Sequence, residues 1–130
     1  MRRPTGEAFT RNAIKRVPKP WGYELIWGHT DRYVGKVLHV NKGESLSRQY
    51  HEMKDETLYV IAGKVLLELQ RGDEKDSITL GVGEAFHITP LTIHRIEALE
   101  DTDIVEVSTP EIHDVVRLDD RYGRAGTTEA

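Results

Sequence analysis

Hydrophobic and β-branched residues occur in short runs along the chain, separated by glycine, asparagine and aspartate. Runs of this length at close spacing are typical of β-strands. No segment of ten or more residues shows the 3.6-residue apolar period of an amphipathic helix. The pattern therefore predicts an all-β domain, a sandwich or barrel of short antiparallel strands, at 23–27, 33–40, 46–51, 57–63, 64–70, 76–80, 84–88, 94–99 and 103–109.

Short polar segments mark the turns between these runs. The segment NKGES at 41–45 predicts a turn around Gly43. Glycine next to a polar residue is also a signal for a β-hairpin. We therefore expect hairpins at AGKV (62–65) and at RGDEKD (71–76).

The ends of the chain differ from its middle. Residues 1–16 and 125–130 are mostly polar or small, so we expect a mobile N-terminal arm and a mobile tail on either side of an ordered domain at 17–124. Within that domain, DVVRLDDRYGR at 114–124 is the segment for which we expect one or two turns of helix.

The composition narrows the class of protein. The 130 residues, 38% of them hydrophobic and 31% charged, suit one soluble domain with a core of its own. A formal net charge of −4 with mixed signs argues against a nucleic-acid partner. The apolar runs are too short to cross a membrane and the first residues resemble no secretory signal, so we expect a cytoplasmic protein without membrane contact. Without cysteine there are no disulfides or thiolate ligands, and metal ligands must come from His, Asp, Glu or Gln.

A cluster of such ligands lies before and after one predicted strand. Gln49 and His51 are two residues apart, so their side chains share one face of an extended segment. Glu56 follows after a short turn, and His94 begins a later strand. Two imidazoles, a carboxylate and an amide oxygen suit a first-row divalent ion. The alternative is a polar strand end with ordinary hydrogen bonds.

The spacing of these residues resembles the first metal-binding motif of the cupin family. In this sequence the motif corresponds to Gly43-x5-Gln49-x-His51-x4-Glu56-x6-Gly63, where x is any residue. Gln49 stands in place of the usual leading His. The segment from Gly83 to His94 resembles the second cupin motif. Its proline is displaced by one position, and Leu91 stands where a glycine is usual.

Within the cupins, the chain is most similar to type II mannose-6-phosphate isomerases, including the isomerase domains fused to mannose-1-phosphate guanylyltransferases. Three segments carry the similarity, which extends over about 17–124: KPWGYE (19–24), GESLSRQYHEMKDETLYVIAG (43–63) and DVVRLDDRYGR (114–124). The last has no role in a generic cupin barrel, so it is the most discriminating. The guanylyltransferase segment of the fused enzymes does not occur in this sequence.

This resemblance implies a single cupin barrel, also called a double-stranded β-helix or jelly roll. It implies one divalent ion (Zn, Mn, Co, Ni, Fe or Mg) bound by Gln49, His51, Glu56 and His94. The implied reaction interconverts mannose 6-phosphate and fructose 6-phosphate through an enediol.

The resemblance also suggests residues that act on the substrate. Lys36 matches a family lysine and would transfer a proton or hold an enediolate oxygen. Arg117 matches an arginine of the C-terminal motif and would bind the sugar or its phosphate. Arg121, Arg124 and His87 are further candidates for substrate binding, but Lys36, His87 and the two arginines also suit solvated or packed positions.

Other functions are compatible with the same residues. Two histidines and a carboxylate suffice for a cupin iron oxygenase. A different sugar isomerase, or a sugar- or metal-binding module without activity, would need no other ligands. By analogy with small cupins we expect a homodimer formed through the outer sheet and the N-terminal strand.

The remaining histidines and the aromatic residues suggest structural roles. We interpret His29, His39 and His113 as surface or loop residues. Trp21, Tyr23 and Trp27 are predicted to form an aromatic stripe on one face of a strand, for core packing or a dimer contact.

Overall fold

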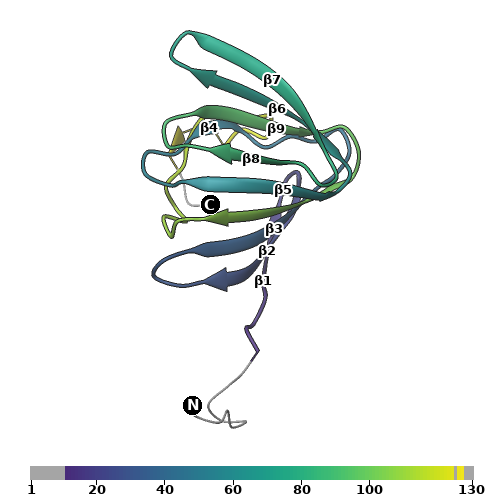
Figure 1. Cartoon of the computed structure of the whole chain (residues 1–130), viewed down its shortest axis with the longest axis vertical. Coiled ribbons are helices and arrows are strands. Elements are labelled where there is room, and N and C mark those ends of the chain that lie inside the picture. Colours follow the sequence, from purple (N-terminus) through teal and green to yellow (C-terminus); the bar gives the residue numbers. More distant parts are fainter. Residues whose placement is uncertain (1–10, 125, 128–130) are drawn as a thin grey trace.

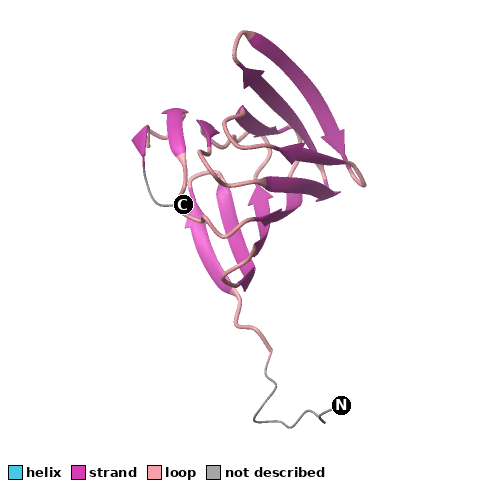
Figure 2. Ribbon diagram, turned by 60° about the vertical axis from the view of Figure 1, so that its left-hand side comes forward, coloured by secondary structure: helices cyan, strands magenta, loops and turns pink. Residues whose placement is uncertain are grey.

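The computed structural model describes residues 11–124 and 126–127, which form two six-stranded antiparallel sheets with a core between them (Figures 1 and 2). The strand order is β1-β2-β3-β10-β5-β8 in sheet A and β12-β11-β4-β9-β6-β7 in sheet B. The strands are β1 (Lys15–Lys19), β2 (Gly22–His29), β3 (Val34–Val40), β4 (Arg48–Tyr50), β5 (Glu56–Ala62), β6 (Lys64–Arg71), β7 (Glu74–Gly81), β8 (Ala85–Ile88), β9 (Ile93–Ala98), β10 (Thr102–Ser108), β11 (Val116–Asp119) and β12 (Gly126–Thr127).

The all-β prediction is confirmed, and every predicted strand is present with small shifts of its ends. Gly43 lies in the predicted turn with a φ of 83°. The hairpin at 71–76 is also confirmed, because Arg71 pairs with Glu74 across a two-residue turn. The long β6–β7 hairpin extends beyond the other strands at the top of Figure 1.

The predicted hairpin at 62–65 is wrong. The two strands on either side of Gly63 belong to different sheets: β5 pairs with β10 and β8, whereas β6 pairs with β7 and β9. Gly63 has a φ of 85°, and a Cβ there would lie 2.3 Å from the Asp101 carbonyl oxygen. Glycine is thus required because the chain turns from one sheet to the other against a neighbouring backbone.

The predicted helical turn at 114–124 is also wrong. Within the described residues there is no helix, and Val116–Asp119 is strand β11, paired with β4. Val115 and Arg117 are buried while Leu118 is exposed, which is the two-residue alternation of a strand. A distant partner strand, rather than local propensity, decides this segment.

Parts of the expected arm and tail are ordered. Lys15 and Arg16 belong to β1, and Gly126 and Thr127 form β12 against β11. Residues 11–14 are in neither a strand nor a helix, and the remainder of the expected mobile ends, at 1–10, 125 and 128–130, lies outside the described residues. Among the described residues, no helix is long and apolar enough to cross a membrane.

The interior has an apolar half and a charged half. Along β3, β5, β9 and β10 the inward residues are aliphatic toward one end, where Leu38, Val60, Ile96 and Ile104 form the core. Toward the other end of the same four strands the inward side chains are polar or charged. They are Lys36, Glu56, His94 and Glu106, and all four are buried. Buried charges need compensation, so the charged half is where a functional site is to be sought.

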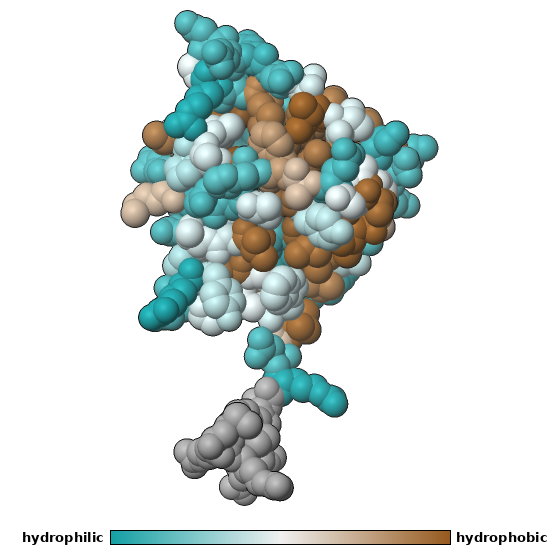
Figure 3. Space-filling view, viewed as in Figure 1, coloured by the Kyte–Doolittle hydropathy of each residue, from teal (hydrophilic) through white to brown (hydrophobic). Residues whose placement is uncertain are grey.

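The outward face of sheet A carries exposed apolar residues, including Tyr59, Ile61 and Val107, and apolar patches are visible on this side in Figure 3. It is a surface where a second copy could bury apolar area, and the expected homodimer stays a prediction.

The predicted aromatic stripe is wrong. Trp21 is buried in the core, whereas Tyr23 stacks on His39 with 4.9 Å between ring centroids. Glu24, the next residue, points inward with Lys36, so Tyr23 belongs to the outward face.

Candidate metal centre

Three buried side chains from different strands meet at the charged end of the interior. His51 lies just after β4, Glu56 is the first residue of β5, and His94 is the second residue of β9. One ligand atom from each lies within 4.8 Å of the others. Each residue is at most 4% exposed.

The hydrogen bonds of the two histidines determine which ring nitrogen faces the carboxylate. His51 Nδ1 lies 2.6 Å from the Asp114 carbonyl oxygen, and His94 Nδ1 lies 2.9 Å from the Thr92 carbonyl oxygen. Because a carbonyl only accepts, both Nδ1 atoms carry the proton and donate it. Both Nε2 atoms are then lone-pair acceptors, as metal-bound histidines require.

The two Nε2 atoms face a third acceptor. Glu56 Oε1 lies 3.3 Å from His51 Nε2 and 3.2 Å from His94 Nε2. In this neutral tautomer no proton separates these atoms, and His51 Nε2 is buried without a hydrogen-bond partner. Three converging acceptors repel one another unless a cation lies between them, so the residues fit a divalent ion.

Gln49, the fourth predicted ligand, lies next to this triad. It pairs with His94 across β4 and β9, and its side chain lines the same interior cavity. Its Oε1 accepts a hydrogen bond of 2.6 Å from Ser47 Oγ. Ligation by Gln49 stays a prediction.

Lys54 compensates the carboxylates beside the triad. Its Nζ lies 3.2 Å from Glu56 Oε2 and 3.2 Å from Glu106 Oε2. Burial alone would lower the pKa of Lys54, but the two carboxylates raise it above its ordinary value. Burial would likewise raise the pKa of Glu56, whereas the ammonium of Lys54 holds it well below its usual range. Burial and the nearby Glu56 raise the pKa of Glu106, although Lys54 opposes them.

The interior cavity is lined by apolar residues, by Glu106 and by five basic side chains: Lys19, Lys36, Lys54, Arg117 and Arg124. Lys36 Nζ donates to Glu24 Oε2 at 3.0 Å, and Lys19 Nζ lies 3.6 Å from Glu24 Oε1. Burial lowers the pKa of Lys19; Glu24 opposes this, and Lys36, Arg117 and Arg124 add to it. The cations are therefore close enough to repel one another, and the cavity favours an anion.

Arg117 is the least compensated of these cations. It is 7% exposed, and its Nε and Nη1 atoms have no hydrogen-bond partner. Arg117 pairs with Gln49, which pairs with His94, so one row across β11, β4 and β9 joins the guanidinium to the triad. The structure thus brings Lys36, Arg117 and Arg124 together with the predicted ligands.

Two predicted substrate-binding residues lie elsewhere. His87 is exposed and pairs with Asp55 at 2.6 Å, because its neighbour Ile88 occupies the inward position of β8. Arg121 is exposed and donates to the Gly43 carbonyl oxygen. Neither residue lines the interior cavity, so we remove both from the candidate site.

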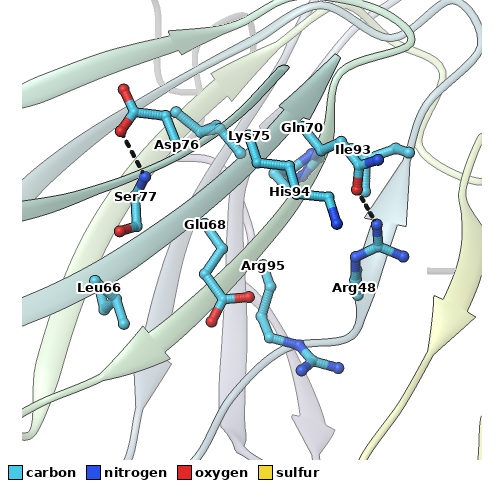
Figure 4. A pocket seen from close by; sticks show the side chains of 11 residues that line it. Arg48, Leu66, Glu68, Gln70, Lys75, Asp76, Ser77, Ile93, His94 and Arg95 are labelled. Atoms are coloured by element: carbon cyan, nitrogen blue, oxygen red, sulfur yellow. Dashed lines mark hydrogen bonds between the residues drawn. The ribbon is translucent and has the colours of Figure 1, made fainter. Parts of the chain in front are cut away.

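A groove of ≈ 740 Å³ on the outward side of sheet B is a second concave region (Figure 4). Its arginines have partners: Arg48 donates to Gln70, and Arg95 pairs with Asp119. Glu68 lies near Arg95 in the same view. Because its charges are mixed and largely paired, the groove is a weaker candidate than the interior cavity.

Leu91, in the loop before His94, has a φ of 68°, which glycine adopts more easily. An L-residue pays about 1–2 kcal/mol there, whereas glycine loses up to about 1 kcal/mol in chain entropy. We therefore predict that Leu91→Gly stabilises the protein by about 0.5–1 kcal/mol in urea unfolding. A destabilised variant would mean that the Leu91 side chain, 56% exposed, makes contacts that outweigh the strain.

Sequence reasoning missed four charged residues of the interior: Lys19, Glu24, Lys54 and Glu106. Lys19 and Glu24 begin and end KPWGYE, the segment that carried a resemblance without an assigned role. Glu106 alternates with Ile104 in an apolar run, which was a usable signal of an inward charge. Lys54 sits in a polar loop and gave no such signal.

Comparison with known proteins places these observations in a family. The Cupin domain family matches residues 36–109. Mannose-1-phosphate guanylyltransferase from Escherichia coli (strain K12) is 38% identical over 116 residues, which are 85% of this chain and 23% of that protein. The corresponding ManC protein from Salmonella typhimurium is 36% identical over the same shares. The chain thus spans about a quarter of the length of these relatives.

Solved structures share the fold. KdgF from Halomonas sp. aligns with a TM-score of 0.63 and 26% identity, over 77% of this chain and 89% of that one. Oxalate decarboxylase from Bacillus subtilis aligns with a TM-score of 0.72 over 85% of this chain and 31% of that one, at 14% identity. At such low identity the second likeness concerns the fold alone.

Proposed function

The chain belongs to the cupin family, and on that basis we propose that it is a metal-dependent isomerase that interconverts mannose 6-phosphate and fructose 6-phosphate. The similarity to mannose-1-phosphate guanylyltransferases supports a mannose phosphate as the substrate. Resemblance of the motifs to type II mannose-6-phosphate isomerases supports the reaction.

The observation that carries the proposal is the unpartnered guanidinium of Arg117 in the cavity that His51 of the acceptor triad also lines. A sugar phosphate has an anion at one end and adjacent carbonyl and hydroxyl oxygens at the other. Arginine forms paired hydrogen bonds with phosphate oxygens. The triad, through its ion, suits the oxygens at the reacting end.

The reaction moves a proton between two neighbouring carbons, from C2 of the aldose to C1 of the ketose, and needs no other reactant. An ion held by His51, Glu56 and His94 would supply Lewis acidity to the sugar oxygens. Arg117 would bind the phosphate, with Lys19 and Arg124, which is paired with Asp120, beside it. Lys36, held at 3.0 Å by Glu24, would hold a sugar oxygen or transfer a proton to it.

A second candidate is an iron oxygenase, because two histidines and one carboxylate are the ligand set typical of that class. The unpartnered guanidinium of Arg117 in the cavity favours the isomerase, since an oxygenase needs no phosphate-binding arginine. A sugar- or metal-binding module without turnover is the third candidate.

The test is a coupled assay of fructose 6-phosphate formation from mannose 6-phosphate. Protein stripped with EDTA receives Mn, Co, Zn, Ni, Fe or Mg separately. We expect at least one ion to restore turnover, His51→Ala to lose it, and His29→Ala, at an exposed histidine, to keep it. Tight metal binding without isomerisation would contradict the proposal. Oxygen consumption with Fe(II) would then favour the oxygenase.

A further inference from the structure

Asp114, in the segment between β10 and β11, contacts the loop at 51–55 through both its side chain and its main chain. Its Oδ1 accepts the backbone N–H of Glu52 at 3.0 Å. Its Oδ2 accepts those of Met53 at 2.7 Å and Lys54 at 2.9 Å. Its carbonyl oxygen lies 2.6 Å from His51 Nδ1. One residue thus holds four consecutive residues of the loop that joins two proposed ligands.

The main-chain contact determines how His51 presents its ring. The proton on Nδ1 is held by the Asp114 carbonyl, so the lone pair on Nε2 points to Glu56 and His94. If the Asp114 backbone moved, the ring could rotate or exchange its tautomer, and Nε2 would no longer be a fixed ligand atom.

The side-chain contact acts on the other ligand. With its N–H bound to Asp114, Lys54 is held where its Nζ reaches Glu56 Oε2 and Glu106 Oε2, both at 3.2 Å. That interaction occupies Oε2 of Glu56 and leaves Oε1 directed at the two histidines. Three N–H groups on one carboxylate are also a strong, charge-assisted anchor for a loop without regular structure.

We propose that Asp114 is the positioning residue of the metal centre, which fixes the ring of His51 directly and the carboxylate of Glu56 through Lys54. The proposal rests on the metal-binding part of the proposed function. It also assigns a role to the C-terminal segment: Arg117 follows three residues later on β11, so the residue that shapes the metal centre and the guanidinium that faces substrate belong to one short segment.

The test compares Asp114→Asn with the same substitution at another aspartate. Asparagine keeps the shape but replaces one acceptor with a donor that faces the loop N–H groups. Asp101→Asn is the control, because Asp101 also accepts a backbone N–H, from Lys42 at 2.8 Å, in an exposed loop. Zn²⁺ affinity is measured by calorimetry, and the His51 tautomer in metal-free protein by ¹⁵N NMR of the imidazole.

We expect Asp114→Asn to weaken Zn²⁺ binding by about 10–100-fold and to populate the second tautomer of His51, while Asp101→Asn changes neither. Asp114→Ala should give the same result, and it decides the question if the Asn variant does not fold. Wild-type affinity with an unchanged His51 tautomer would overturn the proposal. If wild-type protein binds no metal, the proposed function fails, and the tautomer alone then decides the role of Asp114.

Discussion

Replacing Lys54 with methionine should destabilise the metal-free protein by about 3–5 kcal/mol, as expected when one partner of a buried ion pair is removed. Methionine keeps most of the aliphatic stem but not the ammonium, and it leaves Glu56 and Glu106 facing each other without a cation. Both carboxylates are buried, so water cannot take over the compensation. Guanidinium or urea unfolding at neutral pH measures the loss.

Two further variants make this result specific to the buried charges. Lys75→Met, in the exposed β6–β7 hairpin, should change stability by no more than about 0.5 kcal/mol. Adding Glu106→Gln to Lys54→Met should recover part of the loss, because one buried carboxylate is then neutral. A change below about 1 kcal/mol in Lys54→Met would mean that the carboxylates are compensated by other groups.

Replacing Arg117 with alanine should lower kcat/KM for mannose 6-phosphate by about 10²–10⁴-fold while metal content stays at the wild-type level. The range follows from two hydrogen bonds to a charged phosphate at about 1.5–3 kcal/mol each, with about 1.4 kcal/mol per factor of ten. Steady-state kinetics of the metal-loaded protein measures kcat/KM, and metal analysis of the same sample measures the metal content.

The stability of this variant separates a functional from a structural arginine. Burial and the neighbouring Arg124 lower the pKa of Arg117, with Asp120 opposing them, so the charge is held in an unfavourable place. Arg117→Ala should therefore cost little stability, or even increase it, while activity falls. Exposed Arg32→Ala is the control and should change neither. Wild-type kcat/KM in Arg117→Ala would remove this residue from the site.

Three of the four residues predicted for the metal centre could be found from the sequence because they are close together along the chain and follow local rules. Gln49 and His51 alternate along one extended segment, and Glu56 opens the next strand. The same local rules failed for His87, because they did not determine on which face of its strand the side chain lies. In the structure it points outward and pairs with Asp55. They failed at 114–124 too, where pairing with β4 gives a strand instead of a helix.

The sequence by itself determined the all-β class, the turn at Gly43 and the residue types of the candidate metal centre, because strand periodicity, turn chemistry and ligand type are properties of neighbouring positions. Only the tertiary structure decided that Gly63 joins two sheets, that Lys54 bridges Glu56 and Glu106, and that Asp114 holds the loop after His51. Those contacts join residues up to 63 positions apart. Their geometry depends on how the two sheets pack against each other, and the local pattern of a single sequence does not specify that packing.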